Sequence, residues 1–280
     1  PEASIYALKV LNKRGSGYLS DIAAGIDWAV NKNVEVISMS LGASSGTDTL
    51  EKAVDNAYAK GVLVVAAAGN DGSSSILYPA AYDSVIAVSA TDSYDKLASF
   101  SNYGTEIELA APGVDIYSTM PTYDVELTSS GPPWSRYSKD YDYLSGTSMA
   151  CPHVSGVAAL VFDAGPSDSD NDGNLADDVW KIMTDNAEDI GSSNYFGSGQ
   201  VDAEAAVDAV SGSPPTVSIT APTDGSKIIS TGPVTITATA TDDVSVSSVT
   251  FTFAGSSSVD TTSPYSTVWT ITDGTTDGWY

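Results

Sequence analysis

Residues 143–160 read YLSGTSMACPHVSGVAAL, and this stretch decides both the fold and the chemistry expected of the chain. It places the hydroxyl of Ser148 where a helix of small and apolar residues begins. The amino end of a helix offers unpaired N–H groups and a positive partial charge, which suit an oxyanion. Pro152 is compatible with the first turn of such a helix. From this segment alone, a nucleophilic Ser148 and an ordinary helix N-cap are equally good interpretations.

Composition limits the class of protein and its partners. The 280 residues suffice for one large domain and a small one. Lys and Arg number 11 against 36 Asp and Glu, so the net charge of −25 argues against nucleic acid and anionic membranes as partners and favours cations. Cys151 is the only cysteine, which excludes an internal disulfide. No apolar run reaches the roughly 20 residues of a membrane span.

The pattern of apolar residues divides the chain into two regions. Residues 1–210 alternate apolar runs with helical periodicity, which is typical of α/β units around a parallel sheet. Strands are expected at 5–11, 36–41, 62–68, 85–90 and 107–110, and helices from Ser20, from Asp48, at 175–186 and at 203–210. Residues 211–215 form a Pro/Gly/Ser linker. The threonine-rich, alternating runs at 216–220, 234–241, 246–253 and 265–271 predict a small β-sandwich over 216–280.

A second segment bears on the role of Ser148. Residues 62–70 read VLVVAAAGN, a buried strand followed by a tight turn that carries the amide of Asn70. Ligands of α/β sheets bind at the carboxyl ends of strands, where this amide would lie. Taken singly, Asn-Asp-Gly is an ordinary turn. The sequences GSG at 15–17 and SMSLG at 38–42 are also unremarkable alone, but the joint occurrence and order of the four motifs are specific.

Together these motifs resemble the subtilisin-like serine endopeptidases, the subtilases, from residue 1 to about 210. GTSMA followed by PHVSG resembles the nucleophile segment of that family, which makes Ser148 the acylated serine. AAGN resembles its oxyanion segment, so Asn70 would donate a hydrogen bond beside the backbone N–H of Ser148. The resemblance implies a three-layer α/β fold with a central parallel sheet whose amino-terminal part is missing. Residues 216–280 resemble a truncated bacterial immunoglobulin-like module.

The same resemblance implies a set of substrate-binding residues. An extended peptide would lie between two edges, formed by Gly15, Ser16 and Gly17 and by Ser40, Leu41 and Gly42. A pocket for an upstream side chain would be lined by Leu19, Ile22 and Leu41. The primary pocket would have Ala67, Ala68 and Gly69 as its wall and Leu77 at its floor.

The mechanism of the family also needs an Asp and a His, which precede the serine in the chain. Both are expected upstream of Pro1, because residues 1–11 resemble the strand that follows the catalytic histidine's helix in the family, and His153 is the only histidine of the sequence. His153 follows Ser148 by five residues on one helix and is turned away from it at about 100° per residue. It is therefore expected in the core or behind the site. This chain alone is predicted to be inactive; the alternative is a noncatalytic peptide-binding or adhesion protein built on a dead subtilase domain. A secreted or cell-surface location is implied.

An acidic loop indicates a metal site. Asp168, Asp170 and Asp172 alternate before Gly173, as in oxygen-ligated calcium loops. Asn174 and Asp177 are further candidate ligands, although Val179 stands where an EF-hand would have its bidentate Glu. The alternative is a solvated acidic loop. The resemblance adds a weaker cation site of backbone carbonyls at Ala80, Tyr82 and Val85. No organic cofactor is expected, and the ligand of residues 216–280 stays open.

Overall fold

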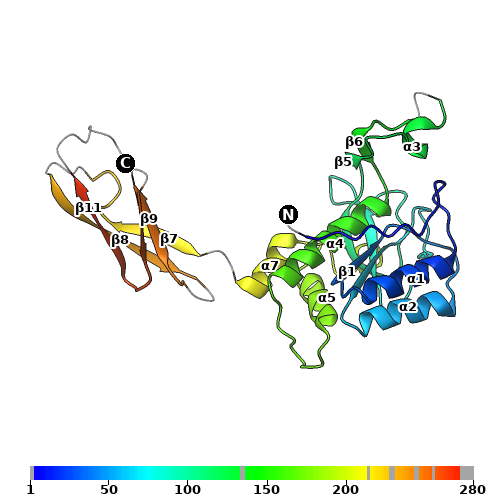
Figure 1. Ribbon diagram of the computed structural model, residues 1–280, viewed down its shortest axis with the longest axis horizontal. Coiled ribbons are helices and arrows are strands. Elements are labelled where there is room, and N and C mark those ends of the chain that lie inside the picture. Colours follow the sequence, from blue (N-terminus) through cyan, green and yellow to red (C-terminus); the bar gives the residue numbers. More distant parts are fainter. Residues whose placement is uncertain are drawn as a thin grey trace. The chain divides into compact units, whose positions relative to one another are not determined.

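A computed structural model describes residues 3–132, 136–212, 215–226, 231–242, 246–253 and 256–271. The chain forms two compact units, Pro1–Val210 and Ser211–Tyr280, each with a core of its own (Figure 1). The predicted linker at 211–215 lies partly outside the described residues. No helix in the described part of the chain is both long enough and apolar enough to cross a membrane.

The first unit is built on a parallel sheet of four strands. Their order is β1 (Val36–Met39), β2 (Leu63–Ala67), β3 (Ile86–Thr91) and β4 (Ile107–Pro112). Every residue of β2 and β3 is buried. This agrees with their continuous apolar sequences, since strands covered on both faces cannot alternate with polar residues. The α/β class is confirmed.

Helices cover both faces of this sheet and produce the three layers. The helices α1 (Leu19–Val30) and α2 (Asp48–Tyr58) share one apolar cluster with one set of β2 side chains. The helices α4 (Thr147–Asp163), α5 (Leu175–Asp185) and α7 (Ala203–Ser211) share a second cluster with the other face. α1 begins one residue before Ser20, because Tyr18 takes the N-cap position. Thr47 caps α2 by accepting the N–H of Leu50.

The strand predicted at residues 5–11 is not formed. This segment has no strand partner among the described residues, and the side chain of Ile5 is 89% exposed. β1 lies at the edge of the sheet and pairs with β2 alone among the described strands. An extended segment becomes a strand only when a neighbouring strand pairs with it through hydrogen bonds. The apolar pattern of residues 5–11 was therefore not enough to predict a strand.

A two-stranded ribbon follows β4 and was not predicted. The strands β5 (Ile116–Met120) and β6 (Asp140–Leu144) pair antiparallel. The short helix α3 (Glu126–Ser129) lies in the connection between them, and another short helix, α6 (Ser193–Phe196), lies near the end of the unit. In Figure 1 the ribbon and α3 project from the layered body of the unit. The ribbon leads directly back to the segment that carries Ser148.

The second unit is all-β, as predicted. One antiparallel sheet has the order β11 (Tyr265–Ile271), β8 (Gly232–Thr241), β7 (Thr216–Ala221), and a second pairs β10 (Ser256–Asp260) with β9 (Val249–Phe253). Its buried core is small and comprises Ala238, Val249, Phe251 and Tyr265. The strand β10 was not predicted, since its SSSVD sequence carries a single apolar residue.

Candidate active site

Ser148 lies at the amino end of α4, the helix buried most deeply against the sheet. Gly146 is the N-cap, with φ 158° and ψ 159°, and its N–H donates to Gly113 O at 2.8 Å. The buried face of α4 includes Ala150, Cys151 and Val154, each fully buried. Small residues let the helix approach the strands closely, and this packing holds the Ser148 segment against the carboxyl-terminal side of the sheet.

Asn70 reaches the same place from the turn after β2. Its Oδ1 accepts hydrogen bonds from Thr147 N at 2.8 Å and from Thr147 Oγ1 at 3.0 Å. Thr147 Oγ1 in turn accepts the N–H of Gly69 at 3.2 Å. These bonds determine which way the amide faces. Its Nδ2 has no protein acceptor among the described residues, and it keeps two N–H donors for a ligand.

The Asn70 amide and the Ser148 backbone N lie close together beside Gly146. The position that a Cβ on Gly146 would occupy lies 3.6 Å from Asn70 Nδ2, 3.6 Å from Ser148 N and 3.7 Å from Asn70 Oδ1. The Met149 N–H is bonded to Gly146 O, whereas the Ser148 N–H has no acceptor in the described part of the chain. The helix amino end adds a positive partial charge. The arrangement can therefore bind an oxygen atom that carries negative charge.

The hydrogen bonding of Pro152 departs from expectation. Pro152 is the sixth residue of α4 and lies beyond its first turn. Proline has no N–H, so Ser148 O lacks the donor that residue i+4 normally supplies. The Ser40 hydroxyl, which follows β1, donates to Ser148 O at 2.7 Å instead. One predicted substrate-edge residue is thus bonded to the backbone of the candidate nucleophile.

The prediction that His153 is a core or supporting histidine is wrong. Its side chain is exposed, and its Nδ1 lies 2.8 Å from Met149 O on its own helix. Cys151 and Val154, two residues before it and one after it, are fully buried, whereas Pro152 and His153 are exposed, so His153 is directed outward. It does not supply a base to Ser148, and the sequence has no other histidine.

The structure brings several predicted pocket residues together. The Leu77 side chain lies against the backbone of two glycines. A Cβ atom added to Gly42 or to Gly69 would lie only 2.8 Å from it. Leu77 N donates to Ala68 O at 3.0 Å, which ties the predicted floor to the predicted wall of Ala67, Ala68 and Gly69. Leu19, Ile22 and Leu41 belong to one apolar cluster. Leu77 therefore lies against Gly42 and Gly69, whereas Ile22, Ala67 and Ala68 are buried.

The loop at residues 15–17 is exposed, and its glycines have separate requirements. Gly15 has φ +72°, which favours glycine. A Cβ on Gly17 would lie 2.4 Å from Val10 O, so Gly17 is required by the chain's own backbone whether or not a substrate binds there. Ser16 accepts the Asn12 N–H at its carbonyl at 2.8 Å, and this bond closes the turn.

Asn102 supports the site and was missed from the sequence. It is fully buried, and its Oδ1 accepts the N–H groups of Asp71 and Ser73 at 2.9 and 3.3 Å. Its Nδ2 donates to Ala68 O and Ser75 O. Asn102 thus holds the turn that carries Asn70. The only signal available was one amide in an otherwise unremarkable SFSN segment, and its partners lie about thirty residues away.

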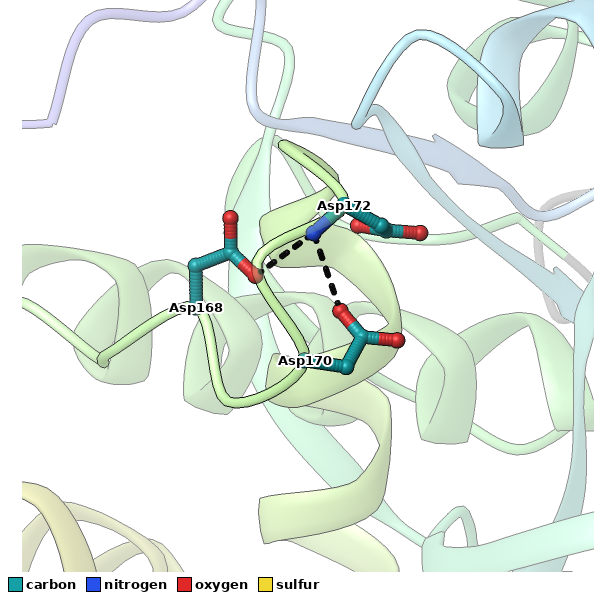
Figure 2. Close-up of side chains that lie close together, drawn as sticks. All are labelled: Asp168, Asp170 and Asp172. Carbon is teal, nitrogen blue, oxygen red and sulfur yellow. Dashed lines mark hydrogen bonds between the residues drawn. The ribbon is translucent and has the colours of Figure 1, made fainter.

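The acidic loop before α5 gathers its carboxylates around its own backbone. Figure 2 shows Asp168 and Asp170 directed at the backbone N of Asp172, each at 3.2 Å. Carboxylate oxygens of Asp168, Asp170 and Asp172 lie within 4.8 Å of one another. Asn174 Oδ1 instead accepts the Ala176 N–H and caps α5.

The two aspartates at the start of α5 differ in their bonding. Asp178 is buried and accepts the N–H of Ser169 with both carboxylate oxygens. Asp177 Oδ1 is buried without a hydrogen-bond partner. Burial raises the pKa of Asp177, the backbone N–H groups of Asp177 and Asp178 partly oppose this, and the charges of Asp172 and Asp178 raise it further. An orphaned carboxylate oxygen near three clustered carboxylates fits a hard cation such as calcium, which takes oxygen ligands.

The carbonyl site expected at Ala80, Tyr82 and Val85 lies in the turn before β3. All three residues are buried, and Val85 N donates to Tyr82 O at 3.1 Å. A cavity of about 440 Å³ next to this turn is lined by Tyr78 and Tyr82 together with the acidic residues Asp48, Glu51, Asp55 and Asp83. The charge around the turn is therefore negative, which favours cations over anions.

Comparison with known proteins agrees with this geometry. The model of the subtilase family matches residues 1–199. The chain belongs to the subtilase family. Its subtilase domain is 48% identical over 210 residues to subtilisin DY from Bacillus licheniformis, covering 74% of this chain and 69% of that protein. It is 45% identical over 206 residues to subtilisin Savinase from Lederbergia lenta, covering 74% and 68% of the two chains.

Other relatives are longer, and the second unit matches a different family. The thermostable alkaline protease from Halalkalibacterium halodurans is 44% identical over 203 residues, which span 72% of this chain and 50% of that protein. A crystal structure of a lanthipeptide protease superposes on the subtilase with a TM-score of 0.60 at 26% identity, over 72% of this chain and 69% of the other. Residues 215–280 match a bacterial Ig domain. The resemblance drawn from the motifs is confirmed, and the family is one of serine endopeptidases.

Proposed function

We propose that the protein hydrolyses peptide bonds through an acyl-enzyme on Ser148, with Asn70 as oxyanion donor. The observation that carries this proposal is the closeness of two N–H donors without a protein acceptor among the described residues, Asn70 Nδ2 and Ser148 N, each 3.6 Å from one point beside Gly146. In acyl transfer, two such donors stabilise the negative oxygen that forms when the hydroxyl attacks the carbonyl carbon.

The proposed reaction has two steps. A general base removes the hydroxyl proton as Ser148 Oγ attacks the peptide carbonyl carbon, and the carbonyl oxygen becomes an anion held by the two donors. When this intermediate collapses, the C–N bond breaks and the leaving amine takes the proton. Water then attacks the acyl-enzyme in the same way and releases the acid. Without a base, a serine hydroxyl is a weak nucleophile.

The base and its orienting carboxylate are proposed to lie outside residues 1–280. His153 is exposed and bonded to its own helix, and it is the only histidine of the sequence. We therefore expect no turnover by the 280-residue chain alone. The alternative, a noncatalytic peptide-binding or adhesion protein on a dead subtilase domain, rests on the same missing base.

The test uses the full-length natural protein and casein. Ser148→Ala should abolish hydrolysis, whereas the exposed control Ser45→Ala should leave it unchanged. Asn70→Ala should lower kcat by about 10² to 10³ with little change in KM, a magnitude that comes from subtilisin itself. Casein binding without hydrolysis by the natural protein would support the noncatalytic alternative instead.

Substrate recognition is proposed to follow the family pattern. An extended peptide would lie between residues 15–17 and residues 40–42, with an upstream side chain over Leu19, Ile22 and Leu41. Leu77, which packs against Gly42 and Gly69, would limit the depth of the primary pocket. We further propose the domain limits 1–210 and 216–280 with a linker at 211–215, and a secreted or cell-surface location.

Calcium is proposed as a structural ligand of the subtilase domain. Asp168, Asp170, Asp172 and Asp177 would hold it, since three carboxylates cluster within 4.8 Å and Asp177 Oδ1 lacks a partner. Asn174 is better described as the cap of α5. The bound ion would neutralise the mutual repulsion of these carboxylates and join the loop to α5. The carbonyls of Ala80, Tyr82 and Val85 are proposed as a second, weaker cation site.

A further inference from the structure

The ribbon of β5 and β6 carries an aromatic surface that the mechanism above does not use. We define the tyrosine face as Tyr117, Tyr141 and Tyr143. Tyr117 and Tyr143 are direct partners across the ribbon, with ring centroids 4.8 Å apart. Tyr117 and Tyr141 stack at 5.5 Å with an interplanar angle of 23°. Side chains alternate along a strand, so the three rings lie on one face of the ribbon.

The tyrosine face is exposed although its rings contact one another. Tyr117, Tyr141 and Tyr143 remain 58%, 52% and 56% exposed. The ribbon projects from the unit (Figure 1). Single exposed apolar residues are ordinary, but three adjoining rings on one face of this ribbon form a contiguous patch. Such a patch is typical of a binding surface.

The position of the ribbon relates this patch to the candidate active site. Tyr143 precedes Ser148 by five residues, and the base of the ribbon is held by the bond from Asp115 N to Ser145 Oγ at 2.8 Å. The ribbon continues from β4, at the opposite edge of the sheet from β1. The proposed substrate edge at residues 40–42 follows β1, and Ser40 from that edge is bonded to Ser148 O. The ribbon and this edge thus reach the Ser148 segment from opposite ends of the strand order.

We propose that the tyrosine face binds aromatic side chains of the polypeptide substrate on the leaving-group side of the scissile bond. The inference rests on the proposed function, in which the acyl part of the substrate occupies residues 15–17 and 40–42. A peptide that crosses Ser148 from that side continues onto the ribbon. Each strand of the ribbon has five residues, about 16 Å in length, which matches about five residues of extended peptide.

Aromatic side chains suit this surface for a geometric reason. Aromatic rings prefer offset-stacked or edge-to-face contacts at centroid distances of about 4.5–7 Å, and Tyr117 already makes such contacts with both neighbours. A substrate ring placed over the patch would extend the same arrangement. In an extended peptide, alternate residues face the ribbon, so aromatic residues at every second position would contact it.

The experiment compares three substrates that share one acyl part, using the full-length natural protein. The first ends in p-nitroanilide and has no residue after the cut. The second continues with five residues that carry Phe at alternate positions, and the third has Ala at those positions. For the natural protein, kcat/KM should be about fivefold to tenfold higher with Phe than with Ala. In the double variant Tyr117→Ala/Tyr141→Ala this ratio should fall to about one.

The matched control is Tyr94→Ala, which removes a 79% exposed tyrosine from the turn after β3 and should leave the ratio unchanged. Both tyrosines in the double variant are more than half exposed, and a thermal unfolding midpoint equal to that of the natural protein would show that it folds. A Phe-to-Ala ratio near one in the natural protein would overturn the inference, while hydrolysis of the anilide would still uphold the proposed function.

If the anilide is not hydrolysed, the proposed function is contradicted, and a binding measurement then tests separately whether the tyrosine face binds aromatic side chains of a polypeptide. The 280-residue chain is titrated with the five-residue Phe peptide and with its Ala counterpart. Tighter binding of the Phe peptide, weakened at least fivefold in the double variant, supports the inference. Equal binding of the two peptides overturns the inference. The inference is also overturned if the natural chain is retained on insoluble polysaccharide and the double variant is not, because the tyrosine face would then bind carbohydrate.

Discussion

At the residue scale, the environment of Ser148 depends on a proline one turn further along the helix. Pro152 cannot donate to Ser148 O, and the Ser40 hydroxyl takes over that role from the loop after β1. The bond joins two segments that are 108 residues apart in the chain. It positions the backbone of the candidate nucleophile against the predicted substrate edge.

This bond can be tested by a double-mutant cycle. Ser40→Ala should lower the free energy of unfolding by about 1 kcal/mol, because Ser148 O then lacks a protein donor. Pro152→Ala restores the helical N–H. In that background, Ser40→Ala should therefore lower the free energy of unfolding by clearly less than in the natural sequence. Urea unfolding followed by circular dichroism gives the four values. Equal costs in the two backgrounds would show that Ser40 and Pro152 are not coupled.

The thiol of Cys151 is expected to be inert in the folded protein. It is fully buried on α4 and donates to Val65 O at 3.5 Å, and burial raises the pKa of the thiol. Since the thiolate is the reactive form, a thiol-specific dye at pH 8 should react at least tenfold more slowly with native protein than with protein in guanidinium chloride. Rapid stoichiometric labelling of the native chain would contradict the burial of Cys151.

At the scale of elements, a hydrogen bond between an indole on α5 and a carboxylate on β4 joins the two elements. Trp180 Nε1 donates to Glu108 Oε2 at 3.4 Å. Burial raises the pKa of Glu108, the bond from Trp180 partly opposes this, and the charge of Asp83 raises the pKa further. The folded state therefore holds the Glu108 proton more tightly than the unfolded state, whose carboxyl titrates near 4.5.

The sign of the resulting pH dependence follows from linkage. A raised folded-state pKa stabilises the fold below the unfolded pKa, and this contribution is lost as the pH rises through the folded pKa. Glu108→Gln keeps an acceptor for Trp180 and cannot ionise. The variant should therefore gain stability relative to the natural chain between pH 4.5 and pH 7 in urea unfolding. The exposed control Glu126→Gln should show no such trend, and a difference that is independent of pH would refute the assignment.

The local pattern of apolar residues predicted some helices and strands of the first unit well and others poorly. The helices α2, α5 and α7 and the strands β2, β3 and β4 lie within one or two residues of their predicted positions, because each has a full period of apolar residues or a buried run. β5 and β6 were missed because neither has a buried face: β5 reads IYSTM, and β6 alternates aspartates with tyrosines. Residues 5–11 were overpredicted, because apolar character does not supply a strand partner.

At the scale of the whole molecule, the two units have separate cores of unequal size. The subtilase domain packs two large clusters on the faces of one sheet, whereas the core of the second unit has four buried residues in the part that the structure describes. The net charge of −25 opposes the compact state through mutual repulsion of carboxylates. Cation binding is therefore expected to contribute to the stability of the chain, and most of all at the acidic loop before α5.

Calcium should raise the unfolding temperature of the subtilase domain. At a free concentration about 100 times Kd, one bound ion contributes about 2.7 kcal/mol, which corresponds to roughly 5–10 °C for a domain of this size. Calorimetry compares the unfolding temperature in EGTA with that in calcium. The double variant Asp168→Asn/Asp172→Asn should lose most of this difference in unfolding temperature. Asp21→Asn, an exposed acidic change on α1, is the control. An equal shift in both variants would place the responsible ion elsewhere.

The sequence by itself determined the family, the α/β and all-β classes of the two units, and the residues Ser148 and Asn70 as candidates. These follow from contiguous motifs and from local periodicity, which a linear chain displays directly. Only the tertiary structure decided that Thr147 orients the Asn70 amide, that Ser40 replaces the donor lost at Pro152, and that His153 faces outward. It also revealed Asn102 and the tyrosine face. Such features depend on pairs of residues distant in the chain, whose contacts form when helices pack against the sheet and strands pair.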